Sequence, residues 1–284
     1  MKISVIHTGN FKLDGGAMFG VVPKTMWNRM NPSDENNLCT WAARCLLIEK
    51  GDQKILVDTG LGNKQDERFR SHFQPHGSNS LMGSLEARGV LPEEITDVIL
   101  THFHFDHVGG AATYDKNGQV IPTFPNATYW SNEIHYNWAY DANPREAASF
   151  LKENFVPLRE QGVLKFMDVE QDIAFNDFIK FRFYYGHTEA MMVPFISLPN
   201  GKTLVFPADL IPSQHHIRLP YVMAYDIRPL VTIEERAAFH EIVTDGNHVL
   251  LFEHDKDLEC GMVAINERGR YVLNKGMKLE EVFQ

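Results

Sequence analysis

Short apolar runs recur along the chain, with longer polar segments between them. The runs predict strands, and they are Ile3–Ile6, Ala43–Ile48, Ile55–Val57, Val98–Leu100, Phe181–Tyr185, Leu204–Phe206 and Val249–Phe252. Two turn signals, Asn200-Gly201 and Arg268-Gly269, each lie between two apolar segments and predict β-hairpins. Because a hairpin makes its two strands antiparallel, we expect mixed sheets rather than purely parallel ones.

Two segments carry helix signals. The segment Pro144–Gln161 begins with a proline suited to a first turn, and Thr232–Thr244 begins with Thr232 followed by Glu235, which has the spacing of a capping box. Both are expected to be outer amphipathic helices that cover the sheets, which gives a fold of the α/β (α+β) class. No short repeat, low-complexity tract or linker interrupts the chain, so we expect one domain over residues 1–284.

Composition narrows the class of protein. A chain of 284 residues that is 44% hydrophobic can bury a sizeable core. The net charge of −10, without a segment rich in Lys or Arg, argues against nucleic acid as a partner. No apolar run reaches membrane-spanning length and the start lacks a signal-peptide pattern, so we expect a cytoplasmic protein without a membrane partner. The cysteines, Cys39, Cys45 and Cys260, are too few and too scattered for a disulfide framework.

The densest group of ionisable residues lies in DVILTHFHFDHVGG, Asp97–Gly110. In an extended segment, alternate residues point the same way, so His102 and His104 face one point. Asp106 and His107 follow at a turn and can reach a neighbouring point. Imidazole and carboxylate ligands suit Zn, Fe or Mn, and Zn is our first choice. The alternative is a solvated histidine-rich loop, but the density of the pattern directly after a strand favours metal.

Three further candidate ligands each follow an apolar strand, and they are His187, Asp209 and His254. Strand ends gathered at one edge of a sheet are where sites are built. Asp58 also follows a strand, directly before Thr59-Gly60. It is expected either to orient a histidine ligand or to be a turn aspartate.

In this order, THFHFDH, GHT, PADL and FEH, with KILVDTG at Lys54–Gly60, resemble the ligand series of the metallo-β-lactamase superfamily over nearly the whole chain. The resemblance implies a four-layer αββα sandwich with two mixed sheets and two divalent metal ions that assist the hydrolysis of an ester-like bond. Carried over by position, it assigns His102, His104 and His187 to one metal, Asp106, His107 and His254 to the other, and Asp209 to both. It places Asp58 in support of these ligands. Asp106 is further expected to protonate the leaving alkoxide.

Two other segments, Leu13–Asn37 and Leu219–Pro229, resemble the quorum-quenching N-acyl-homoserine lactonases and the related methyl parathion hydrolase group. This resemblance implies a lactonase with a small-molecule lactone or ester substrate. The alternatives are hydrolysis of organophosphate triesters or aryl esters, and a non-catalytic metal-binding protein. Four residues are expected to line a substrate pocket, namely Met18, Phe19, Trp27 and His216. Alternatively, the loop at residues 13–37 packs as part of the core or forms a homodimer contact.

Two departures from the family pattern weaken the substrate assignment and leave the metal assignment intact. The loop GHTEAMM has no second histidine after His187, so it must find other packing. Pro212 stands where well-studied small lactonases place a tyrosine.

Overall fold

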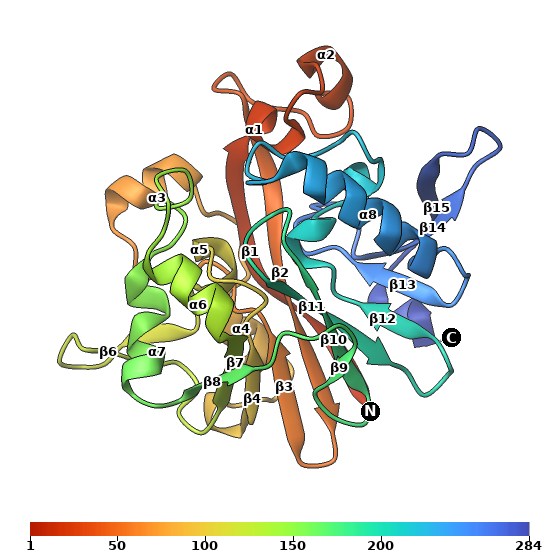
Figure 1. Cartoon of the computed structure of the whole chain (residues 1–284). Helices are drawn as coiled ribbons and strands as arrows, with labels where there is room; N and C mark the ends of the chain where they lie inside the picture. Colours follow the sequence, from red (N-terminus) through yellow and green to blue (C-terminus); the bar gives the residue numbers. More distant parts are fainter. Residues whose placement is uncertain (284) are drawn as a thin grey trace. The chain divides into compact units, whose positions relative to one another are not determined.

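The computed structural model describes residues 1–283 of the chain (Figure 1). It contains two compact units, the first formed by residues 1–10 and 43–169 and the second by residues 11–42 and those from 170 onward. The chain passes from one unit to the other within strands β1 (Lys2–Asp14) and β2 (Leu38–Lys50). The expectation of a single domain over residues 1–284 stays a prediction.

The first unit is built on a six-stranded sheet with the order β1-β2-β3-β4-β7-β8. Its remaining strands are β3 (Gln53–Val57), β4 (Asp97–Ile99), β7 (Thr128–Asn132) and β8 (Leu164–Met167). β2 and β3 are antiparallel, whereas β3, β4, β7 and β8 run parallel to one another. A separate small hairpin pairs β5 (Ala112–Tyr114) with β6 (Val120–Pro122).

Short helices accompany this sheet, and α6 and α7 pack beside β7 and β8 (Figure 1). They are α3 (Glu67–Phe73), α4 (Leu81–Glu86), α5 (Phe105–Val108), α6 (Glu133–Tyr140) and α7 (Val156–Glu160), with 3-10 turns at Pro92–Glu94 and Lys152–Asn154.

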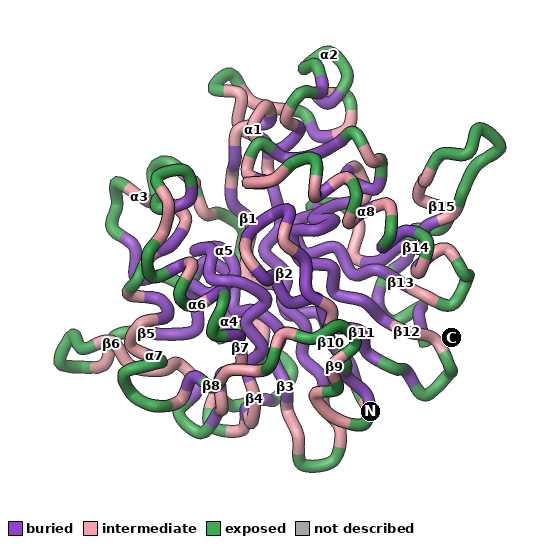
Figure 2. The backbone as a smooth tube through the Cα atoms, in the orientation of Figure 1, coloured by how far each residue is buried: buried purple, intermediate pink, exposed green. Residues whose placement is uncertain are grey.

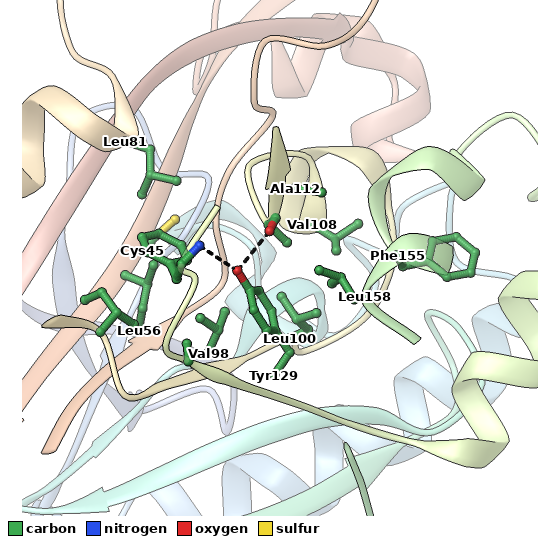
Figure 3. Packing of buried hydrophobic residues seen from close by; sticks show 14 of the residues in the cluster. Cys45, Leu56, Leu81, Val98, Leu100, Val108, Ala112, Tyr129, Phe155 and Leu158 are labelled. Atoms are coloured by element: carbon green, nitrogen blue, oxygen red, sulfur yellow. Dashed lines mark hydrogen bonds between the residues drawn. The ribbon is translucent and has the colours of Figure 1, made fainter. Parts of the chain in front are cut away.

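The core beneath them includes Tyr129, whose hydroxyl donates to the Ala111 carbonyl at 3.0 Å and accepts from the Phe124 amide at 2.9 Å (Figure 3). Full burial of a large apolar side chain contributes roughly 1.5–3 kcal/mol. The core therefore holds β4 and the turn that follows it.

The second unit is built on a seven-stranded sheet with the order β15-β14-β13-β12-β11-β10-β9. Its strands are β9 (Ile173–Ala174), β10 (Ile179–Tyr184), β11 (Met191–Ser197), β12 (Thr203–Val205), β13 (His248–Leu251), β14 (Cys260–Ile265) and β15 (Tyr271–Met277). Only the β12–β13 pairing is parallel among these neighbours. Both sheets are therefore mixed, as the hairpin signals predict.

The longest helix of the second unit is α8 (Pro229–Val243), and its buried face lies on the sheet. The Phe239 ring is 6.0 Å from Tyr184 on β10 and 6.1 Å from Phe195 on β11. In each unit the strands are largely buried and the turns exposed (Figure 2). The shorter helices are α1 (Gly15–Phe19) and α2 (Lys24–Trp27), with 3-10 turns at Ala208–Leu210, Gln214–Ile217 and Leu279–Phe283.

The predicted strands and both predicted hairpins are confirmed. Each predicted apolar run overlaps a strand, and the two turns carry Gly201 at φ 83° and Gly269 at φ 68°, which a residue with a side chain rarely adopts. β11 and β12 flank the first turn, and β14 and β15 flank the second.

The helix predicted at Pro144–Gln161 is wrong over most of its length, because only Val156–Glu160 is α-helical. The Asn143 side chain accepts from the amides of Arg145 and Glu146 and closes a turn in place of a helix. The Ser149 carbonyl accepts from the Phe105 amide, so it is not part of a helical ladder.

The second predicted helix is confirmed, but its start is not at Thr232. α8 begins at Pro229, and the Thr232 amide already donates to the Arg228 carbonyl within the first turn. Glu235 accepts from the amides of Tyr185 and Gly186 outside the helix, so the expected capping box does not form.

Two absences hold for residues 1–283. No helix there is long and apolar enough to cross a membrane. Cys39, Cys45 and Cys260 are buried and form no disulfide within that range.

His240 on α8 predicts an acid-sensitive second unit. Burial lowers its pKa from 6.5 to about 4, so as the pH falls below 6.5 the unfolded chain binds a proton before the folded chain does. The stability that neutral His240 contributes is fully present above a pH of about 6.5 and is lost as the pH falls toward about 4. The substitution His240→Gln should therefore reduce the loss of unfolding free energy between about pH 6 and pH 5 by up to roughly 1.4 kcal/mol. Urea denaturation of both metal-free proteins measures the difference, and equal losses would contradict it.

Candidate metal centre

The histidine-rich turn of the first unit brings its imidazoles together. After β4 the chain has no regular secondary structure at His102 and is extended at His104, and Nε2 of His102 lies 3.1 Å from Nδ1 of His104. The ring centroids of His102 and His107 are 3.9 Å apart. Asp106 follows on α5, with Oδ2 at 3.8 Å from Nε2 of His107. All four side chains are buried and lie close together, and their role as metal ligands stays a prediction.

Asp58 supports this turn from the end of β3. Its Oδ1 accepts from the Thr101 amide at 2.8 Å, and Oδ2 accepts from the Thr101 hydroxyl at 2.7 Å. The same Oδ2 lies 3.1 Å from Nδ1 of His107. With a proton on Nδ1, His107 presents Nε2 as its ligand nitrogen. Asp58 therefore contacts a candidate ligand, and its role in orienting that ligand stays a prediction.

A second buried carboxylate, Glu146, lies behind His104. Its Oε1 is 3.6 Å from Nε2 of His104, and its Oε2 accepts from Trp138 Nε1 at 2.8 Å and from Asn143 Nδ2 at 2.6 Å. The carboxylate is thus held on the side of His104 that faces away from His102. This leaves Nδ1 of His104 as the nitrogen directed toward a shared ligand point.

The second unit carries the other three candidate ligands, and two of them, His187 and His254, face the carboxylate of the third, Asp209. Oδ2 of Asp209 lies 3.1 Å from Nε2 of His187, and Oδ1 lies 3.2 Å from Nε2 of His254. Each oxygen of Asp209 therefore faces a different imidazole. This split is the arrangement that a bridging carboxylate needs, and the donor set of imidazole and carboxylate fits Zn, Fe or Mn.

The outer nitrogens of these two histidines are also held. Nδ1 of His187 lies 2.8 Å from Oδ1 of Asp226, and Nδ1 of His254 lies 2.8 Å from the Ala42 carbonyl. Burial alone lowers the pKa of His187, but the adjacent carboxylates of Asp209 and Asp226 together raise it to about 10. The pocket thus favours a positive charge at this position, which a bound cation would supply in place of the proton.

The four residues expected to line a substrate pocket are packed inside the second unit. Met18, Phe19, Trp27 and His216 are at most 1% exposed. The Phe19 ring is stacked with Trp27 at 5.5 Å and with His216 at 5.2 Å. Burial lowers the pKa of His216 to about 3, so the ring is neutral and donates from Nε2 to the Met18 carbonyl. These contacts give the four a packing role, and their part in a substrate pocket stays a prediction.

The exposed neighbours of this cluster line a cavity. Val21 is 90% exposed and Met26 is 50% exposed, and both border a cavity of about 630 Å³ with Tyr221 and Tyr271. The loop at residues 13–37 therefore both covers a core and borders an open apolar cavity.

The two departures from the family pattern are accommodated locally. In GHTEAMM, Glu189 pairs with Arg228, and Met191 enters the buried strand β11. The carbonyl of Pro212 accepts from the His254 amide at 2.9 Å, so this residue contacts the backbone of a candidate ligand.

Sequence reasoning missed two supporting carboxylates, Glu146 and Asp226. Asp226 lies within LPYVMAYDIRP, a segment singled out only for its family resemblance. Glu146 lies within the segment predicted to be an outer helix, and no sequence signal marks it. Both contact histidines more than thirty residues away along the chain, which local patterns do not reveal.

Comparison with known proteins shows the superfamily to which the chain belongs. A family model described as the metallo-beta-lactamase superfamily matches residues 41–254, and the chain belongs to that superfamily. The predicted enzyme class, a hydrolase of this superfamily, and the predicted fold with mixed sheets are confirmed.

Individual relatives share only about a quarter of their residues or fewer with this chain. An N-acyl homoserine lactonase of Bacillus thuringiensis is 21% identical over 242 residues, which cover 81% of this chain and 86% of the relative. A probable metal-dependent hydrolase from Staphylococcus aureus has a TM-score of 0.85 and 25% identity, covering 98% of both chains. AidC, a dizinc quorum-quenching lactonase solved with N-hexanoyl-L-homoserine as product, has a TM-score of 0.77 and 21% identity, covering 98% of this chain and 95% of AidC.

The contact between Asp226 and His187 predicts a loss of metal affinity in Asp226→Asn. An asparagine keeps the shape but removes the charge that favours the required tautomer of His187, so affinity should fall about 10- to 100-fold. Competition with a chromophoric chelator measures the change. The matched control is Asp245→Asn, because Asp245 makes an equally short contact, 2.8 Å, with His248 and neither residue is a candidate ligand. Parental metal affinity in both variants would show that Asp226 does not support His187.

Proposed function

We propose that the chain is a metal-dependent lactonase that binds two divalent ions. One ion is assigned to His102, His104 and His187, the other to Asp106, His107 and His254, and Asp209 is assigned to both. The observation that carries the proposal is the pair of contacts at Asp209, whose two oxygens face His187 and His254 at 3.1 and 3.2 Å. The assignment across the whole chain rests on family membership and on the order of the motifs.

When bound, a pair of divalent ions lowers the pKa of a water ligand and polarises the oxygen of the bond to be cleaved. The chain's own residues prepare the ligands for this role. Asp58 and Asp226 lie at hydrogen-bond distance from Nδ1 of His107 and His187, so Nε2 of each ring keeps the lone pair that a cation requires. The Glu146 carboxylate lies near Nε2 of His104, at 3.6 Å. These outer contacts can stay in place when the ions bind.

Asp106 is proposed to move the proton of the reaction. It lies on α5 next to His107 and is 7% exposed. A carboxylate has two oxygens, so one could hold a cation while the other accepts a proton from the attacking water and passes it to the departing alkoxide. This division separates Asp106 from Asp209, whose oxygens both face imidazoles.

The proposed substrates are N-acyl-homoserine lactones or related lactones, in keeping with the lactonases among the relatives. Zinc is the proposed metal, with Fe and Mn as alternatives, in keeping with the dizinc relative AidC. A homodimer and a cytoplasmic location complete the proposal. The alternative substrates, organophosphate triesters and aryl esters, enter as arms of the test.

The substrate assignment predicts the outcome of a panel assay. The zinc-loaded protein is offered N-acyl-homoserine lactones of several chain lengths, an aryl ester and a phosphotriester, and hydrolysis is followed by proton release. We expect lactone turnover that a chelator abolishes and added zinc restores. Turnover of the triester alone would transfer the chain to the alternative class, and turnover of no substrate at full zinc loading would favour the non-catalytic alternative.

The assigned proton transfer predicts a large effect of Asp106→Asn. The amide can still approach a cation but cannot donate an acidic proton, so kcat should fall about 100- to 10,000-fold. Metal content is measured on the same sample. Near-parental turnover at full metal occupancy would show that Asp106 does not move the proton.

A further inference from the structure

A buried lysine grips the turn that carries Asp106 and His107. Lys64 is 8% exposed, and its ammonium donates to the carbonyls of Gly109 at 2.5 Å and Ala112 at 2.6 Å. Lysine is rarely buried, because its charge loses hydration. Here burial lowers the pKa of Lys64 to about 8, which still leaves the group mainly protonated at neutral pH. The chain therefore keeps a charged side chain buried beside Gly109 and Ala112, although its desolvation is unfavourable.

The two carbonyls that receive Lys64 belong to the segment directly after α5. A helix of four residues leaves its final carbonyls without partners inside the helix. Gly109 follows α5 immediately, and Ala112 begins β5. One ammonium thus fixes two points of the chain just beyond the proposed ligands.

The loop that carries Lys64 is pressed against the same segment by its backbone. A Cβ built on Gly109 would lie 1.9 Å from the Leu61 carbonyl oxygen, and one on Gly62 would lie 2.2 Å from the Gly109 carbonyl oxygen. Only glycine fits at either position. The Gly110 amide donates to the Gly60 carbonyl at 3.2 Å, so the two backbones are also hydrogen-bonded.

The same loop also holds α5 at His107. Both the amide and the hydroxyl of Thr59 donate to the His107 carbonyl, at 2.8 and 2.9 Å. The loop from Asp58 to Lys64 therefore holds the ring of His107 through Asp58, its backbone through Thr59, and the exit of α5 through Lys64. A shift of α5 away from this loop would strain or break these contacts.

We propose that Lys64 is a positioning residue that fixes α5 so that Asp106 and His107 are held in the geometry needed for the second metal ion. This inference rests on the proposed function for the existence of two ions, and it adds a residue that is neither a ligand nor a neighbour of one in sequence. Lys64 acts through the carbonyls of Gly109 and Ala112. Loss of Lys64 should lower the affinity for the ion assigned to Asp106 and His107. It should leave unchanged the affinity for the ion assigned to His102 and His104.

The test uses the full chain with Co²⁺ as a spectroscopic probe that reports its two binding steps separately. The variants are Lys64→Met, which removes charge and donors, and Lys64→Gln, which keeps shorter donors and guards against failure to fold. Lys64→Arg keeps charge and donors, and Lys54→Met is the matched control because Lys54 pairs with Glu94 at the surface. Each titration is run well below the thermal midpoint of that variant's metal-free form.

We expect Lys64→Met and Lys64→Gln to lose about 10- to 100-fold in affinity for one Co²⁺ ion, while the other binds as in the parent chain. Lys64→Arg should recover most of the lost affinity, and Lys54→Met should change neither step. Parental affinity for both ions in the Met or Gln variant would overturn the inference, as would an equal loss at both steps. If the parent chain itself binds no pair of ions, the proposed function fails, which is a separate result.

Discussion

The candidate centre depends on one electrostatic constraint: buried imidazoles and carboxylates that face one another need a positive charge between them. Asp209 is 6% exposed, and both of its oxygens face histidine nitrogens. Removing a carboxylate from water costs several kcal/mol unless nearby charges and hydrogen bonds compensate. In the metal-free chain the proton on His187 provides part of that compensation, and a divalent ion can take its place. The chemistry of the fold follows from this exchange.

Both units place an acceptor beside the outer nitrogen of several candidate ligands. Carboxylates lie at hydrogen-bond distance from His107 and His187, and a main-chain carbonyl lies at hydrogen-bond distance from His254. The Glu146 carboxylate is farther from His104, at 3.6 Å. An outer acceptor fixes both the orientation and the tautomer of an imidazole. The candidate ligands are therefore ordered in the metal-free chain, which would reduce the cost of ordering them when an ion binds.

The sequence predicts which candidate ligands gather because strand alternation and strand ends are local, and their role as metal ligands stays a prediction. His102 and His104 point together through a two-residue period, and His187, Asp209 and His254 each follow an apolar strand. Tertiary contacts decided what the sequence did not predict. Pro144 indicates a helix start, but the Asn143 side chain closes a turn there. Because this segment is not helical, the Glu146 carboxylate lies near His104, at 3.6 Å. The loop at residues 13–37 mixes buried and exposed apolar side chains, which composition alone cannot separate.

The central claim is that seven named side chains hold two ions, and anomalous X-ray diffraction from crystals of the zinc-loaded chain tests it most directly. We expect two zinc peaks per chain, one bonded to His102, His104 and His187 and the other to Asp106, His107 and His254. Asp209 should contribute one oxygen to each peak. A single peak, or peaks bonded to other residues, would contradict the claim.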